Sequence, residues 1–267
     1  MLDQKILKAS ALALDKALAS GKTIPQFSQL YPEMTIDDGY AIQAEWTKLR
    51  LSQGRKIIGR KIGLTSRAMQ QVAQIAEPDY GTLMDDMLFA DNSEIPFDRF
   101  IAPLVEVEIA FILGQRLEGD NITLADVLKA TDYVCPAVEI VDSRVIRVDP
   151  ETGKRRKVFD TIADNAACAG IITGGLPVRP MDVDLRWIGA IVSRNGIIEE
   201  TGVSAGVLNH PGNGIVWLSK RFAPHGIALE PGQVILGGSF TRLLSVERGD
   251  TFHADFGPLG SIGFRFV

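Results

Sequence analysis

The chain has 267 residues and a formal net charge of -5; 46% of its residues are hydrophobic and 23% are charged. These values are ordinary for a globular protein with one large domain around a buried core. They argue against a nucleic-acid-binding protein, which usually carries a basic face, and no uninterrupted apolar run approaches the ~18 residues of a membrane span.

Two helices are expected at the start of the chain. Residues 3–21 carry apolar side chains at roughly helical spacing, and Gly21 ends the pattern. Residues 35–53 form the second helix, with Thr35 as N-cap, acidic residues in the first turn and a glycine after its end. We expect residues 1–80 to be a mainly helical N-terminal region.

Residues 81–267 are expected to form a β-rich, metal-binding catalytic domain that makes one integrated unit with the helical region. A strand at 56–64 and a helix at 66–76 precede it. Short β-branched runs between turn residues then predict strands, and helices are expected at 123–131 and 205–222. Asn195-Gly196 between two such runs predicts a hairpin with a type I′ turn. Because strands and helices do not alternate regularly, the predicted fold class is α+β.

The two cysteines predict a reducing compartment. Cys135 and Cys168 lie in apolar stretches, where cysteine behaves as a small buried hydrophobe. Two cysteines make neither a disulfide framework nor a zinc site. We therefore expect a cytoplasmic protein.

One predicted strand carries two acidic residues among apolar ones. In LVEVEIAFIL (104–113), Glu106 and Glu108 share one face, because side chains alternate along a strand. The opposite face is wholly apolar. Two buried carboxylates so close together are unfavourable unless a positive charge holds them, and a hard dication with oxygen ligands does so.

Glu139 offers a third ligand, since it is the one acid in the apolar run YVCPAVEIV (133–141). Three carboxylates, with the remaining positions left to water and substrate, suit Mg²⁺ or Mn²⁺. The residues alone leave an alternative open, in which the Glu106–Glu108 face is solvated and Glu139 pairs with an arginine. The spacing by itself does not decide between them.

One hydrolase motif is matched but not favoured. Residues 202–206 read G-x-S-x-G, and a nucleophile elbow needs a strand leading straight into a helix, followed by an acid and a histidine. The residues before this match are predicted to form a hairpin edge. We therefore do not assign a serine nucleophile.

A set of short segments, in order along essentially the whole chain, resembles the fumarylacetoacetate hydrolase superfamily. Within that superfamily the set is similar to the hydratase and decarboxylase branch of aromatic catabolism. The segments are GRKIGLTS (59–66), EPDYG (77–81), the Glu106–Glu108 strand, PAVEIVDSR (136–144), FDTIADNA (159–166) and GGSFT (237–241). The resemblance implies a fumarylacetoacetase-like β-rich fold and a homo-oligomer built from dimers, up to decamers. It also implies that Glu106, Glu108 and Glu139 bind Mg²⁺, with Mn²⁺ as an alternative.

The implied substrate is a small 2-oxo acid or dioate, and the implied reaction is addition of water across a carbon–carbon double bond. Such a site needs a cation near the developing enolate and an acid or base near the reacting carbons. Lys61 is the candidate cation and Asp79 the candidate acid or base. Lys157 lies where the superfamily has a site lysine, and Ser239 and Thr241 are candidates to bind the substrate carboxylate.

The second carboxylate of a dioate needs a further cation. Arg144, Arg155 and Arg156 are all candidates, and the sequence does not choose among them.

Three other functions remain open for this scaffold. They are decarboxylation of a six-carbon 2-oxo dioate, hydrolysis of a carbon–carbon bond in an acylpyruvate, and a non-catalytic role as partner of a pathway enzyme. A five-carbon monoacid is an alternative substrate for the hydratase. The superfamily's hydrolases often have a histidine before the metal strand, and this chain has none before His210, which counts against hydrolysis.

Overall fold

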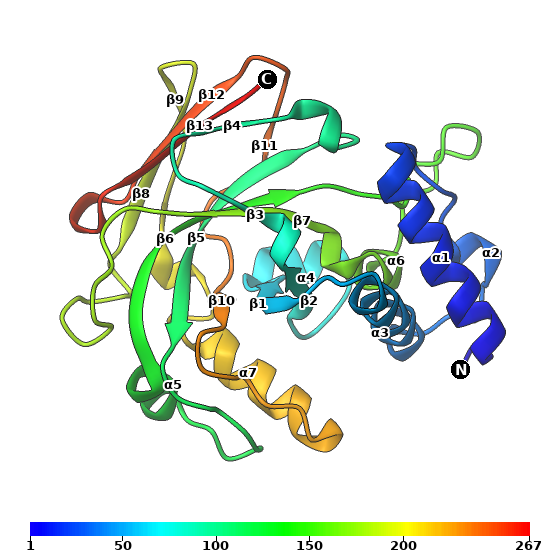
Figure 1. Cartoon of the computed structure of the whole chain (residues 1–267), viewed down its shortest axis with the longest axis horizontal. Coiled ribbons are helices and arrows are strands. Elements are labelled where there is room, and N and C mark those ends of the chain that lie inside the picture. The colour runs from blue at the N-terminus through cyan, green and yellow to red at the C-terminus, as the bar shows by residue number, and fades with distance from the viewer.

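The computed structural model describes residues 1–267, and two β-sheets with a helical layer at one end make up the fold (Figure 1). The α-helices are α1 (Gln4–Ser20), α2 (Phe27–Leu30), α3 (Ile36–Ser52), α4 (Arg67–Ala73), α5 (Leu124–Ala130), α6 (Val158–Ala163) and α7 (Asn213–Phe222). The 3-10 turns are η1 (Asp85–Met87), η2 (Phe97–Arg99), η3 (Asn165–Ala167), η4 (Ser204–Gly206), η5 (Ala223–His225) and η6 (Gly257–Leu259). This mixture of helices and sheets confirms the predicted α+β class.

The larger sheet has eight strands in the order β2-β1-β10-β5-β6-β7-β3, and β11 also pairs with β5. Its strands are β1 (Ile57–Gly63), β2 (Asp79–Met84), β3 (Leu88–Phe89), β5 (Leu104–Leu113), β6 (Thr131–Val141), β7 (Cys168–Thr173), β10 (Val234–Leu236) and β11 (Leu244–Ser245). The division of the chain at residue 80 remains a prediction. The structure adds that β1, which precedes that boundary, pairs with β10 inside this sheet.

The smaller sheet has five strands in the order β4-β13-β12-β8-β9. Its strands are β4 (Ser93–Ile95), β8 (Gly189–Arg194), β9 (Ile197–Val203), β12 (Thr251–Asp255) and β13 (Ser261–Phe266). Asn195 and Gly196 join β8 to β9 with φ values of 55° and 82°. Positive φ at both positions confirms the predicted hairpin turn.

The main hydrophobic core lies between the two sheets. The apolar face of β5 contributes Val105, Val107 and Ile109, and the smaller sheet contributes Phe252 and Phe264. Five aliphatic or aromatic side chains in strict alternation along β5 explain why that strand has one face in this core. Its other face, which carries the two glutamates, is turned away from the core.

The helical layer packs around its own smaller core. Leu14 of α1, Ile42 and Trp46 of α3, and Ala163 of α6 are buried together there. The predicted N-cap is confirmed, because the Thr35 hydroxyl accepts from an amide in the first turn of α3.

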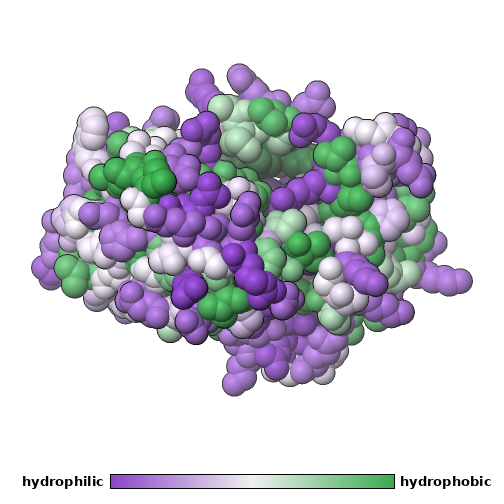
Figure 2. All heavy atoms as spheres, turned by 90° about the horizontal axis from the view of Figure 1, so that it is seen from above, coloured by the Kyte–Doolittle hydropathy of each residue, from purple (hydrophilic) through white to green (hydrophobic).

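None of the helices combines the length and the apolar character that a membrane-spanning helix needs. On the face of the molecule drawn in Figure 2, hydrophobic residues form separate groups among polar ones.

The helix expected at 205–222 is wrong in its first half. The chain there forms only the short turn η4, and α7 begins at Asn213. Leu208 and Asn209 have φ values of 47° and 67°, which a right-handed helix excludes, and Pro211 follows. The apolar pattern before residue 213 therefore belongs to an irregular segment.

Asn165, in the turn between α6 and β7, fastens this turn to the edge of the larger sheet. Its side-chain amide donates to the carbonyl of Thr82 at 2.9 Å, and its side-chain oxygen accepts from the amide of Thr82 at 2.7 Å. Thr82 lies in β2, the terminal strand in the sheet order. Asn165 has a φ of 54°, and Ala166 and Ala167 after it are also left-handed.

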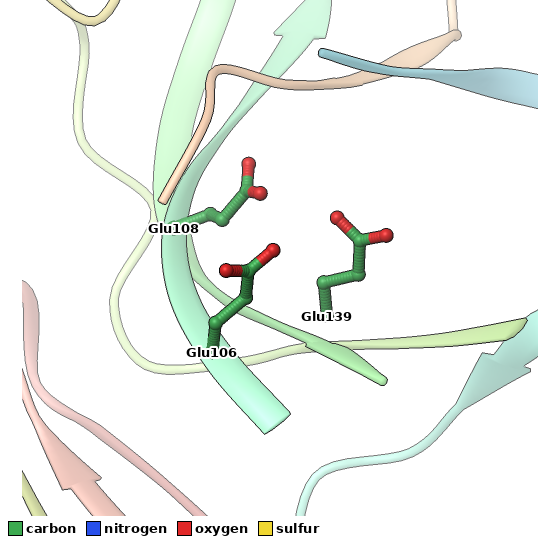
Figure 3. A group of neighbouring side chains, drawn as sticks. All are labelled: Glu106, Glu108 and Glu139. Carbon is green, nitrogen blue, oxygen red and sulfur yellow. The ribbon is translucent and has the colours of Figure 1, made fainter. Parts of the chain in front are cut away.

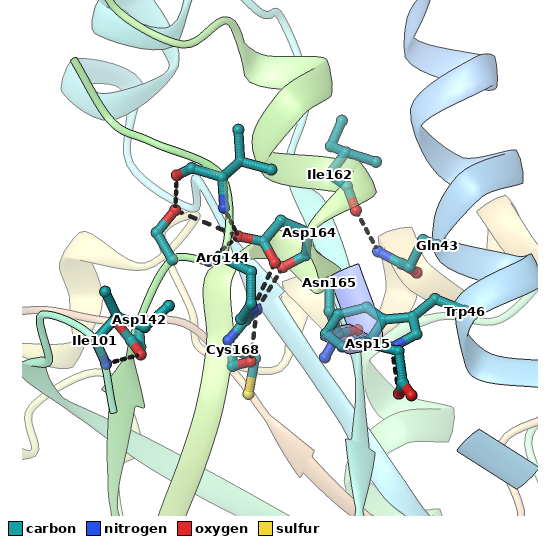
Figure 4. Close-up of polar contacts among 12 residues, drawn as sticks. Asp15, Gln43, Trp46, Ile101, Asp142, Arg144, Ile162, Asp164, Asn165 and Cys168 are labelled. Carbon is teal, nitrogen blue, oxygen red and sulfur yellow. Dashed lines mark hydrogen bonds and ion pairs between the residues drawn. The ribbon is translucent and has the colours of Figure 1, made fainter. Parts of the chain in front are cut away.

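A buried ion pair joins the segment after β6 to the end of α6 (Figure 4). Arg144 Nε lies 2.6 Å from Asp164 Oδ1, and both side chains are almost fully buried. The Asp164 carboxylate also accepts from the amides of Arg144 and Val145. Arg144 Nη2 donates to the carbonyls of Asp164 and Cys168, so each group is well satisfied.

Asp164→Ala is expected to lower the free energy of unfolding by about 3–5 kcal/mol, because it leaves the Arg144 guanidinium buried without a counter-charge. Urea unfolding followed by circular dichroism measures the change. The matched control is Asp182→Ala, which breaks an exposed pair with Arg179 and should cost less than about 1 kcal/mol. Equal effects in the two variants would contradict this account.

Candidate metal centre

The register of β5 and β6 assembles three glutamates on one face. Glu106 lies directly opposite Glu139, and Glu108 lies opposite Ala137. Residues that face each other across antiparallel strands point to the same side of the sheet, so Glu139 joins the face that alternation assigns to Glu106 and Glu108. The small side chain of Ala137 leaves space beside Glu108.

The three carboxylates converge on a common point (Figure 3). One oxygen from each lies within 4.8 Å of the others. Glu108 and Glu139 are buried, with 1% and 0% of their surfaces exposed, and Glu106 is half-buried. Of the three glutamates, Glu106 is therefore the one that keeps contact with solvent.

Like charges at this spacing strongly disfavour full ionisation. Burial and the neighbouring charge of Glu139 raise the pKa of Glu106 to about 7, although Lys61 and Ser239 oppose that rise. Burial and the other two glutamates raise the pKa of Glu108 well above its ordinary value. A nearby dication would restore the ionised state of all three groups.

The hydrogen bonding of Glu139 fits a cation at this point. Neither oxygen of its buried carboxylate has a hydrogen-bond partner. The Lys61 ammonium lies 3.3 Å from Glu139 Oε1, close enough for an ionic contact. Buried carboxylate oxygens are normally hydrogen-bonded, so two oxygens without a hydrogen bond, beside two further carboxylates, would suit a hard cation.

Lys61 and Asp79 lie together above Gly63, next to the glutamates. Lys61 and Gly63 share one face of β1, and Asp79 of β2 is directly opposite Gly63. A Cβ on Gly63 would lie 2.3 Å from Asp79 Oδ1 and 3.1 Å from Lys61 Nζ. Only glycine at this position leaves room for both charged groups.

Both charged groups are buried and have altered pKa values. Burial disfavours the Lys61 ammonium, but the carboxylates of Glu139 and Asp79 outweigh it and raise the Lys61 pKa. Burial raises the pKa of Asp79, and Lys61 opposes that rise. Asp79 Oδ1 has no hydrogen-bond partner. The site thus holds a cation and, beside it, a carboxyl group that accepts a proton more readily than usual.

Ser239 and Thr241 lie on the segment beside β5. Thr241 Oγ1 accepts from the amide of Val107 at 3.3 Å, and Ser239 Oγ donates to the carbonyl of Thr241 at 3.0 Å. Just before them, the amide of Gly238 donates to Glu108 Oε2 at 2.7 Å. Gly238 has a φ of 117°, which favours glycine, so the paired glycines of GGSFT serve to bring this amide to the cluster.

Lys157 is placed differently from the other predicted site residues. It is exposed at the start of α6, and its ammonium lies 5.5 Å from the centre of the Phe159 ring. The structure brings together the three glutamates, Lys61 and Asp79, but it does not place Lys157 in contact with them. Its role in the reaction stays a prediction.

Sequence reasoning did not assign roles to Gly63 and Gly238. Each lies within a segment that carries the family resemblance, and glycine inside or beside a strand signals close approach of another group. The sequence does not show which group approaches each glycine, because Gly63 meets Asp79 and Gly238 meets Glu108 only in the folded chain.

Comparison with known proteins identifies relatives over the full length of the chain. Residues 56–267 match the family model for the fumarylacetoacetate hydrolase C-terminal domain. The chain is 57% identical to 2-oxo-hept-4-ene-1,7-dioate hydratase of Escherichia coli over 267 residues, which is 100% of both chains. It is 40% identical to 2-keto-4-pentenoate hydratase of Paraburkholderia xenovorans (strain LB400) over 96% of this chain and 93% of that protein.

A solved structure agrees with these relatives. The 4-oxalocrotonate decarboxylase from Pseudomonas putida G7, complexed with magnesium and adipate, superposes with a TM-score of 0.94 at 33% identity. The match covers 100% of this chain and 99% of that one. The chain therefore belongs to the fumarylacetoacetate hydrolase family.

Proposed function

We propose that the protein is a Mg²⁺-dependent hydratase, a hydro-lyase that adds water to 2-oxo-hept-4-ene-1,7-dioate. The product is 4-hydroxy-2-oxoheptane-1,7-dioate, and the reaction belongs to 4-hydroxyphenylacetate catabolism. The observation that carries this proposal is the 57% identity, over the whole of both chains, to a relative named for that hydratase activity. The glutamate cluster with Lys61 and Asp79 is independent support, because it suits metal-assisted chemistry on a 2-oxo acid.

Glu106, Glu108 and Glu139 would hold the metal ion. Oxygen-only ligands favour Mg²⁺ and also accept Mn²⁺, and a structural relative of the same fold carries magnesium with a dicarboxylate. When bound, the ion supplies Lewis-acid polarisation of the 2-oxo carbonyl. The chain's contribution is to keep three carboxylates converged and mostly out of water, so that the substrate's 2-oxo acid end has a defined place.

We propose that Lys61 stabilises the negative charge that develops on the substrate and that Asp79 transfers the protons. The raised pKa of Lys61 keeps its ammonium protonated beside the substrate, where it stabilises the negative charge that develops when a proton leaves C3. Asp79 has a raised pKa and an Oδ1 without a hydrogen-bond partner, so it can take the proton from C3 and deliver it to C5, which moves the double bond to C3–C4. Water then adds its oxygen at C4 and a proton at C3.

Three further residues are proposed to contact the substrate. Ser239 and Thr241 offer hydroxyls beside Glu106, where they would bond the carboxylate of the 2-oxo acid. Lys157 would reach the site only by turning its exposed side chain away from Phe159.

A direct assay separates hydration from decarboxylation. The purified protein with Mg²⁺ is given 2-oxohept-4-ene-1,7-dioate and, separately, the six-carbon 2-oxohex-3-enedioate. Loss of ultraviolet absorbance, CO₂ release and product mass are followed. Hydration adds one water without CO₂; stoichiometric release of CO₂ from either dioate would refute the proposal and identify a decarboxylase.

We also propose a cytoplasmic homo-oligomer. The exposed hydrophobic side chains of Trp187, Ile197 and Ile198 lie on or near β9, the terminal strand of the smaller sheet, and support contact with another copy. Light scattering gives the mass in solution, and a monomer would contradict this part of the proposal.

A further inference from the structure

The segment after β6 and the loop that returns to α6 place three arginines close together. They are Arg144, Arg147 and Arg156, and the charges of the first two lower the pKa of Arg156. Arg144 is committed to its buried pair with Asp164. Arg147 is half-buried, and its Nη2 donates to the carbonyl of Ala102 at 3.1 Å.

Arg156 has few hydrogen-bond and charge partners for a partly buried guanidinium. Its guanidinium donates to the hydroxyl of Ser143, a neutral group, and no carboxylate lies within ion-pair distance of it. Burial lowers the pKa of Arg156, and Asp164 and Asp160 only partly oppose that change.

Both of those acids are occupied elsewhere. Asp164 is paired with Arg144, and Asp160 accepts from the amide and hydroxyl of Ser28. A partly buried guanidinium with no carboxylate partner is costly unless an anion binds to it.

The position of Arg156 relative to the metal cluster is given by its neighbours. Ser143, to which it donates, comes four residues after Glu139 along the chain. The cations that oppose the raised pKa of Asp79 are Lys61 and Arg156. Lys61 also contacts Glu139. Arg156 is therefore close enough to Asp79 for its charge to act there, next to Lys61 and the glutamate cluster.

We propose that Arg156 binds the second carboxylate of a dioate substrate and so makes the site select dioates over monoacids. This inference rests on the proposed function, since the 2-oxo acid end must lie at the glutamate cluster for the other end to reach Arg156. A guanidinium presents parallel N–H groups that match a carboxylate, and an anion there would supply the missing counter-charge. The neighbouring Arg155 is exposed, and Arg144 has no free donor pair.

The test compares Arg156→Gln with the wild type on two substrates. These are 2-oxohept-4-ene-1,7-dioate and 2-oxohept-4-enoate, which has the same chain without the second carboxylate. The variant is expected to lose about 10–100-fold in kcat/KM on the dioate, mainly through KM, and less than about threefold on the monoacid. Arg155→Gln is the matched control and should change neither value.

Arg156→Lys provides a second variant. It keeps the charge but not the planar pair of donors, so it should recover part of the lost dioate activity without changing the monoacid rate. Equal losses on the two substrates, or an unchanged dioate KM in Arg156→Gln, would overturn the proposal. The monoacid rate also shows that each variant is folded.

A binding measurement keeps this inference separate from the proposed function. Calorimetry with heptane-1,7-dioate in the presence of Mg²⁺ requires no turnover. Weaker binding to Arg156→Gln than to the wild type supports the subsite even if the wild type hydrates neither substrate, a result that would refute the hydratase alone. Equal binding to both proteins overturns the subsite.

Discussion

Replacing Glu139 by glutamine is expected to reduce kcat/KM on the order of 10³-fold, the upper range for removal of one preorganised electrostatic group. Glu139 is fully buried, both its oxygens lack hydrogen-bond partners, and it contacts Lys61. The amide keeps the size of the side chain but removes the charge that we propose holds a dication. Steady-state kinetics over a range of Mg²⁺ concentrations measures the loss.

The same substitution should also remove the effect of Mg²⁺ on the stability of the protein. In the metal-free protein its two effects oppose each other, because it relieves the repulsion between the facing Glu106 and Glu139 but leaves the buried Lys61 ammonium without its nearest carboxylate. The expected result is therefore that Glu139→Gln abolishes the rise in Tm that Mg²⁺ produces in the wild type. Glu94→Gln, at an exposed position in β4, should keep that rise. A normal Mg²⁺ response in Glu139→Gln would refute the metal assignment.

Lys61→Met is expected to lower kcat by on the order of 10²–10³-fold while Mg²⁺ still binds. Only 4% of the Lys61 surface is exposed, and its ammonium is the cation nearest to Glu139 and Asp79. Methionine keeps the apolar stem in its buried place, so the change removes chiefly the charge that we propose stabilises the developing enolate. The rate at saturating substrate and calorimetric titration with Mg²⁺ separate catalysis from metal binding.

The matched control for Lys61→Met is Lys56→Met, at an exposed position just before β1. It should leave kcat unchanged, since its side chain is in solvent. If Lys61→Met kept kcat but lost Mg²⁺ binding, Lys61 would serve only to orient the glutamates. If it lost neither, the proposed role of Lys61 would be wrong.

Much of the fold is local enough to be predicted from the sequence. The caps and apolar spacing of α1 and α3, the turn at Asn195-Gly196 and the alternation along β5 all depend on residues within a few positions of one another. For the same reason, alternation alone placed Glu106 and Glu108 on one face of β5, and the structure confirms that both belong to the cluster.

The rest of the site depends on contacts between distant residues. That Glu139 faces Glu106 follows from the register of β5 against β6, and that Asp79 faces Gly63 follows from the register of β1 against β2. Periodicity does not encode register, because shifting one strand by two residues keeps the same faces. The choice among Arg144, Arg155 and Arg156 was open for a similar reason, since only the fold shows which one already has a carboxylate partner.

The turn that carries Asn165 has a consequence for the solubility of the protein. A terminal strand such as β2 leaves backbone groups free to pair with a strand of another molecule, which is a route to aggregation. The Asn165 side chain bonds both the amide and the carbonyl of Thr82, as one residue of an added strand would. It therefore blocks the outer side of β2 at a fixed point. The left-handed turn at Asn165, Ala166 and Ala167 thus occupies the sheet edge that carries Asp79, at a point where a strand of another molecule would otherwise pair.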